Sequence, residues 1–145
     1  MCDTALAMPP PEILGAPTWI DIPALSVARA RDFYAALFGW EYLPSAVAVP
    51  AEVMLVIKFP GQNAGLGGAI SKVDEKQMSK SNKESTPVVY YHVKCVDEII
   101  EKVQKMGHEV AQEKEPAGPM GWSAIVRDTE GNLVGVYAAK KTDKA

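Results

Sequence analysis

The stretch Gly65–Lys72 reads GLGGAISK, and a similar stretch, LVGVYAAK, occupies Leu133–Lys140 near the C-terminus. A constant offset aligns the two stretches and places Gly67 opposite Gly135. Repetition at one large spacing is typical of a chain that contains two copies of one structural unit. We therefore expect each stretch to form the last strand of such a unit.

The first copy is predicted to span residues 18–72. In it TWIDIPAL places Ile20 and Ile22 on one face and Trp19, Asp21 and Pro23 on the other, which is the period of a half-buried strand. VARARDFYAALF follows with apolar residues at helical spacing, between Ser26 as a candidate N-cap and Gly39 as a stop. WEYL, EVMLVIKF and LGGAISK then have the composition of strands. The predicted order is one strand, one helix and three strands.

The second copy, residues 88–140, repeats this order. VVYYHV is interpreted as its first strand, and the helix that follows is expected to end before Gly107. HEVAQEK, WSAIVRD and LVGVYAAK are the three later strands, and TEGN is the turn between the last two.

The segments outside the two copies have a different composition. Residues 1–17 are rich in Pro and Ala and are expected to form a flexible arm. The polar residues 73–87 are interpreted as a surface linker, and 141–145 as a tail. Residues 18–140 are thus predicted to form a single domain of two modules.

Composition excludes several classes of protein. The net charge is −3, and no dense run of Lys or Arg indicates nucleic acid or an anionic membrane as a partner. No apolar run reaches the roughly 18 residues that span a bilayer, so we expect a cytoplasmic protein. Two cysteines are too few for a disulfide framework or a thiolate zinc site. A small molecule is the expected partner.

The two ends of the domain resemble a known family. WIDIPALSVARARDFYAALFGWEY is similar to the opening, and GPMGWSAIVRDTEGNLVGVYA to the closing segment, of the vicinal oxygen chelate superfamily. This superfamily includes glyoxalases, bleomycin-resistance proteins and extradiol dioxygenases, and the resemblance is greatest to its lactoylglutathione-lyase-related members. It implies an α+β fold in which two βαβββ modules form a curved mixed sheet, a cup around a pocket, often within a homodimer.

The resemblance also indicates where a metal ion would lie. In metal-dependent members four side chains point into the cup, and these positions carry over to Trp19, Gly67, Val88 and Gly135. None of these residues supplies a carboxylate or imidazole, so no metal or other cofactor is expected. The two glycines have two interpretations: they leave room on the floor of the pocket, or they permit close packing of neighbouring strands.

Strand alternation then selects the other residues that face the cup. Asp21 and His92 are the pair able to move protons near neutral pH, and Tyr90 is a third catalytic candidate. Each also has a structural alternative as a hydrogen-bonded or wall residue. The expected substrate-binding residues are Trp19, Lys58, Gly67, Val88, Trp122, Gly135 and Tyr137. Ala69, Met54, Val56 and Ala124 are expected on the same face.

Three functions remain open at this point. The first is a metal-independent lyase, isomerase or cyclase that acts on an organic substrate, aromatic substrates included. The second is a protein that binds or sequesters a small molecule without chemistry. The third is a glyoxalase or dioxygenase with unconventional metal ligands such as Asp21 and His92, which are fewer than a catalytic site normally uses.

Overall fold

The fold is seen in a computed structural model of the chain. It describes residues 14, 17–43, 49–61, 66–81 and 86–140 of the 145. The expected tail and nearly all of the expected N-terminal arm lie outside these residues, so both remain predictions. None of the helices in the described part is long and apolar enough to cross a membrane.

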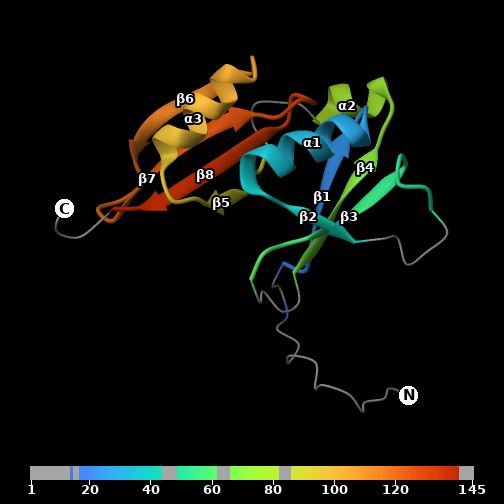
Figure 1. The fold of residues 1–145 in the computed structure, drawn as a ribbon, viewed down its shortest axis with the longest axis horizontal. Helices are drawn as coiled ribbons and strands as arrows, with labels where there is room; N and C mark the ends of the chain where they lie inside the picture. The colour runs from blue at the N-terminus through green and yellow to red at the C-terminus, as the bar shows by residue number, and fades with distance from the viewer. Residues whose placement is uncertain (1–13, 15–16, 44–48, 62–65, 82–85, 141–145) are drawn as a thin grey trace, which may run out of the picture.

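Two modules follow one another along the chain, and each contains one helix and four strands (Figure 1). The first consists of β1 (Trp19–Ala24), α1 (Val27–Phe38), β2 (Glu41–Leu43), β3 (Met54–Lys58) and β4 (Gly67–Lys72). The second consists of β5 (Tyr90–His92), α3 (Val96–Lys105), β6 (Val110–Pro116), β7 (Gly121–Arg127) and β8 (Leu133–Ala139). The predicted α+β class and the two βαβββ modules are confirmed.

The two sheets have the same topology. Their strand orders are β1-β4-β3-β2 and β5-β8-β7-β6, and in each sheet the first strand runs parallel to the last while the other pairs are antiparallel. Trp19 pairs with Gly67 in the first sheet, and Tyr90 pairs with Gly135 in the second. The repeat in the sequence is therefore a repeat in strand register.

Helix α1 begins and ends where its sequence predicts. Ser26 is the N-cap, and its Oγ accepts a hydrogen bond from the backbone N–H of Arg29 at 3.2 Å. Gly39 ends the helix with φ 72°, a left-handed conformation that costs glycine little, and its N–H donates to the Ala35 carbonyl at 2.9 Å. The buried stripe of α1 comprises Val27, Ala30, Phe33, Tyr34 and Leu37.

One hydrophobic core joins the two modules. It contains Ile22 and Ile70 of the first sheet, Val126 and Val136 of the second, and buried residues of both helices. In Figure 1, α1 lies between the first sheet and the second module, and its Phe33 ring meets the ring of His108, after α3, with centroids 5.6 Å apart. The helix-covered sides of both sheets thus face this shared core.

Neither α1 nor α3 covers the other side of its sheet. We call the outer side of the first sheet face A, with Trp19, Asp21 and Gly67, and that of the second sheet face B, with Tyr90, His92, Gly135 and Tyr137. Trp19 is 52% exposed and Tyr90 is 48% exposed, although both are large aromatic residues. Because the covered sides share a core, faces A and B point outward from it.

The turn between β7 and β8 locks the modules together. Asp128, buried in this turn, accepts a hydrogen bond from the Tyr34 hydroxyl of α1 at 2.6 Å. Asn132 donates from Nδ2 to the carbonyl of Pro23 in β1 at 2.8 Å. Glu130 accepts from the backbone N–H groups of Leu25 and Ser26 and from the guanidinium of Arg29.

Burial and hydrogen bonding act differently on the two carboxylates of this turn. Burial raises the pKa of Asp128 above its ordinary value, although hydrogen bonds from Tyr34 and Asn132 oppose the rise. Burial also disfavours the charged form of Glu130, but its hydrogen bonds, first of all those from Arg29, outweigh burial and lower its pKa. Both carboxylates accept several hydrogen bonds, so the turn is a satisfied polar cluster within the core.

The segment expected to be a surface linker contains a helix. α2 (Glu75–Ser81) follows the first module, and Met78 in it is buried at 4% exposure. The side chain of Asp74 accepts a hydrogen bond from the Gln77 N–H at 2.8 Å, as an N-terminal capping residue does. Met78 is the single apolar residue of α2, so the sequence of this helix has no apolar period from which it could be predicted.

Candidate functional site

Face A presents an indole ring above a glycine. A Cβ atom added to Gly67 would lie 3.0 Å from Cζ3 and 3.2 Å from Cε3 of Trp19, its partner on β1. The ring therefore occupies the space that a side chain at position 67 would need. Beside it, the Ser71 hydroxyl donates a hydrogen bond to Oδ1 of Asp21 at 2.8 Å, so this carboxylate is held by its own sheet.

Face B repeats the arrangement with a phenol. A Cβ atom at Gly135 would lie 2.6 Å from Cδ2 of Tyr90, its partner on β5. Two residues along the strand, the His92 ring meets the Tyr137 ring edge to face, with centroids 5.9 Å apart. Tyr90, His92 and Tyr137 thus place three rings on this face.

The register corrects one predicted site residue. Val88 was assigned as the counterpart of Trp19, but it lies before β5, and the pairing with Gly135 makes Tyr90 the counterpart. The assignment was two residues too early because a short strand gives little alternation from which to fix its phase.

The structure also decides between the two interpretations of the glycines. Gly67 and Gly135 do not leave an open floor, because the rings of Trp19 and Tyr90 cover them. They permit close packing of an aromatic side chain across a parallel strand pair. A Gly and an aromatic residue at matching places of each copy were the signal in the sequence, but only the register shows that they touch.

The facing expected for β7 is wrong. Ala124 is fully buried in the core, and Trp122 packs against that core. Trp122 pairs with Ala138, whereas Ser123 pairs with Tyr137, so Ser123 rather than Trp122 lies on face B. The Trp122 ring instead contacts the ammonium groups of Lys114 and Lys140, each 4.6 Å from the ring centroid.

The facing expected for β3 agrees with the pairing. Val56 pairs with Ala69, which itself pairs with Asp21, so these residues share face A. Ile57, one residue along, is in the core. Lys58 lies at the same side of the strand as Val56, 3.8 Å from Glu41, and its side chain is 60% exposed. Its role in binding stays a prediction.

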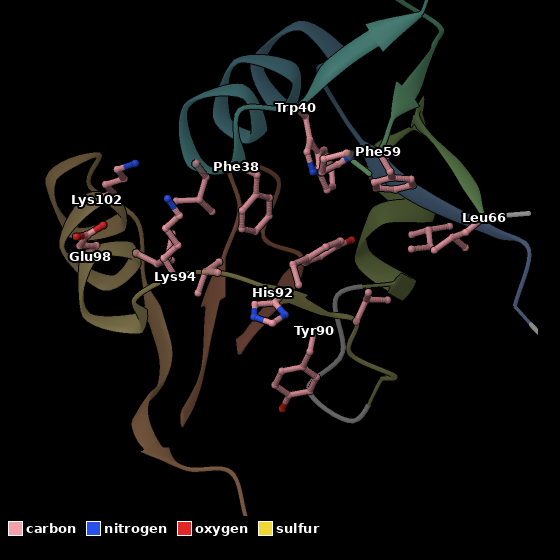
Figure 2. A pocket seen from close by; sticks show the side chains of 16 residues that line it. Phe38, Trp40, Phe59, Leu66, Tyr90, His92, Lys94, Glu98 and Lys102 are labelled. Carbon is pink, nitrogen blue, oxygen red and sulfur yellow. The ribbon is translucent and has the colours of Figure 1, made fainter. Parts of the chain in front are cut away.

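A cleft of about 560 Å³ opens between the modules, and only two of the predicted site residues line it. Tyr90 and His92 line it (Figure 2). Asp21 lines a smaller hollow of about 180 Å³ between β1 and the start of the second module. The predicted proton-transfer pair, Asp21 and His92, thus borders two different cavities of the chain.

The residues at the four positions that the resemblance assigns to metal ligands do not fit a metal ion. With the corrected register they are Trp19, Gly67, Tyr90 and Gly135, and they include no carboxylate and no imidazole. Across the described ranges, no three His, Cys, Asp or Glu side chains lie close enough to one another to share an ion. These four residues therefore give no basis for a reaction step that uses a metal ion at those positions.

Comparison with known proteins identifies the family. Residues 17–136 match the family described as the Glyoxalase/Bleomycin resistance protein/Dioxygenase superfamily. The chain belongs to this superfamily. The resemblance to the superfamily is therefore confirmed. The match is not specifically to lactoylglutathione lyase.

Relatives and solved structures agree with this membership. A glyoxylase-like domain-containing protein of Didymella fabae is 34% identical over 115 residues, which are 78% of this chain and 85% of that protein. CFP32 of Mycobacterium tuberculosis, named as a candidate glyoxylase, is 26% identical over 130 residues, 88% of this chain. The chain spans 47%, about half, of the length of CFP32.

A solved structure shows the same fold with a ligand. It is a variant of the fosfomycin resistance protein FosX of Listeria monocytogenes, in complex with Mn(II) and 1S,2S-dihydroxypropylphosphonic acid. Its TM-score is 0.66 at 17% sequence identity, over 88% of this chain and 93% of the FosX chain. Members of the superfamily bind small molecules, and at this identity the likeness to FosX establishes the fold alone.

Proposed function

We propose that this protein binds a small organic molecule with a planar or apolar part on faces A and B, with no metal ion at the superfamily's ligand positions. The observation that carries the proposal is the repeated pair of an exposed aromatic ring over a glycine, Trp19 over Gly67 and Tyr90 over Gly135. An aromatic ring held flat against a sheet offers contact area without the cost of ordering a flexible side chain. These pairs stand where other members carry metal ligands.

The proposal includes a homodimer. Each chain has one face A and one face B that point outward from its core. Each face exposes about half of a large aromatic side chain, which is an unusual surface for a monomer. In a closed two-fold pair, face A of one copy would lie opposite face B of the other, and two equivalent sites would form. Light scattering is expected to give twice the mass of one chain; a monomer at all concentrations would contradict this part.

Ligand binding tests the proposal directly. We expect a panel of planar aromatic acids, measured by ligand-observed NMR in the presence of EDTA, to contain at least one compound that binds. Trp19→Ala and Tyr90→Ala are each expected to weaken its binding about fivefold, since a lost ring contact is worth about 1 kcal/mol. Met120→Ala is the control, because Met120 is 63% exposed and lies on the loop before β7.

Two results would contradict the proposal. One is affinity that both ring variants leave unchanged; the other is binding that appears only after a divalent ion is added.

A metal-independent lyase, isomerase or cyclase is the second candidate function. The observation in its favour is that Tyr90 and His92, both predicted to be catalytic, share face B with Tyr137 at the mouth of the cleft. An imidazole beside two phenols is able to transfer a proton to or from a bound substrate. Asp21 would join them only if face A of a second copy covered face B. Turnover that His92→Gln abolishes while ligand binding persists would favour this candidate over binding alone.

A further inference from the structure

The cleft between the modules has a composition that the proposed site on faces A and B does not use. It lies between the end of α1, strand β5 and the near side of α3, and its volume of about 560 Å³ is within the range of small-molecule sites. Of the residues assigned above to faces A and B, only Tyr90 and His92 are also among those lining the cleft. The cleft is therefore a separate place in the fold that shares one edge with face B.

One end of the cleft is aromatic and apolar. Figure 2 shows Trp40, Phe59 and Leu66 on this side, with Phe38 between them and Lys94. The rings support one another, because the Trp40 centroid lies 5.4 Å from that of Phe38 and 5.0 Å from that of Phe59. Tyr91 completes the wall, 5.0 Å from Phe38. Rings packed in this way are already ordered, so a ligand would not bear the cost of ordering them.

The other end is charged. Lys94, Glu98 and Lys102 line it, with the last two on α3, and Figure 2 shows them on the side opposite Leu66. Two ammonium groups and one carboxylate leave a net positive charge at this end. A cationic group beside an apolar wall attracts an anionic group that is attached to an apolar body.

We propose that the cleft is a binding site for an amphipathic organic anion. The apolar or aromatic body lies against Phe38, Phe59 and Leu66, and the carboxylate, sulfonate or phosphate lies between Lys94 and Lys102. This proposal does not depend on the function proposed for faces A and B, because the two sets of residues are largely different.

The test uses 8-anilinonaphthalene-1-sulfonate, whose ring system and sulfonate match the two ends of the cleft and whose fluorescence rises in apolar surroundings. We expect saturable binding of one dye per chain. The double variant Lys94→Glu with Lys102→Glu is expected to weaken binding at least about tenfold, because it replaces the two cations that attract the sulfonate with anions that repel it. Lys105→Glu is the matched control: it reverses a charge on the same helix but does not line the cleft.

A second arm separates this site from faces A and B. Trp19→Ala is expected to leave dye affinity unchanged, and amide shifts in a titration followed by NMR should centre on Lys94, Glu98 and Lys102. The proposal is overturned if no saturable binding occurs, if the Lys94 and Lys102 double variant binds like Lys105→Glu, or if Trp19→Ala alone removes the binding. Failure of the aromatic acids to bind faces A and B would leave these outcomes unaffected.

Discussion

Replacing Asp128 by Ala is expected to lower the free energy of unfolding by about 3–4 kcal/mol, as the loss of a buried polar cluster typically does. Asp128 Oδ1 accepts from the backbone N–H groups of Glu130 and Asn132 at 2.8 and 2.9 Å. Its Oδ2 accepts from the Tyr34 hydroxyl at 2.6 Å and from Asn132 Nδ2 at 3.0 Å. Alanine leaves four donors without this acceptor, in a place where water has little access.

Two further variants show whether the effect comes from this cluster. Tyr34→Phe removes one of the four hydrogen bonds and is expected to cost about 1–2 kcal/mol. Asp128→Asn keeps an oxygen for the two backbone N–H groups but sets its amide against that of Asn132, so an intermediate loss is expected. Urea denaturation followed by circular dichroism measures all three. A loss below about 1 kcal/mol for Asp128→Ala would show that the turn does not join the modules in this way.

The second large loss of stability is expected for a substitution at Gly68, but not at its neighbour Gly67. A Cβ atom at Gly68 would lie 2.7 Å from the backbone oxygen of Ile20 and 2.9 Å from the Phe59 ring. Backbone atoms cannot move aside without a large energetic cost. Gly68→Ala is therefore expected to destabilise the protein by about 2–3 kcal/mol, as overpacking does. At Gly67 the same atom meets only the exposed Trp19 ring, at 3.0 Å, which is able to swing outward.

Gly67→Ala is therefore the matched control for Gly68→Ala. Both positions are in β4 and neither has a positive φ. The stability gained because alanine restricts the unfolded chain is therefore similar for the two substitutions. Gly67→Ala is expected to change stability by less than about 1 kcal/mol. Equal losses at the two positions, or a larger loss at Gly67, would contradict the packing described for face A.

Much of the fold follows from local pattern. In β1 the alternation of Ile20 and Ile22 with Trp19 and Asp21 predicted which side meets the core, because one side of the strand must be apolar to lie under α1. Helix α1 was predicted with its cap and its stop because Ser26 and Gly39 act within their own turn of chain.

What local pattern did not predict depends on contacts between distant residues. The turn around Asp128 was recognised as a hairpin, but the hydrogen bond from Tyr34 joins residues far apart in the chain. In β7 the residues Trp122, Ala124 and Val126 form an apolar set, which was the available signal that they face the core. The facing of β7 was instead chosen to match that of β3, where Leu55, Ile57 and Phe59 look like core, and this outweighed that signal.

Only part of the candidate site was predicted, because the rest also depends on contacts between distant residues. Trp19, Gly67, Tyr90, Gly135 and Tyr137 were named from the sequence, and the register places them on faces A and B. The contact of each ring with its glycine depends on pairing between strands, and no single strand contains that information. The cleft, likewise, exists only because the end of α1 meets β5 and α3 across the two modules.

The most direct test of the central claim is a calorimetric titration of the purified, EDTA-treated protein with Mn(II), the ion bound in the FosX structure. Since an indole ring, a phenol and two glycines occupy the positions that the resemblance assigns to metal ligands, we expect no stoichiometric binding of Mn(II), while the aromatic ligand binds equally with and without it. One Mn(II) per chain, bound with micromolar or better affinity and lost in Tyr90→Phe or His92→Gln, would contradict the account.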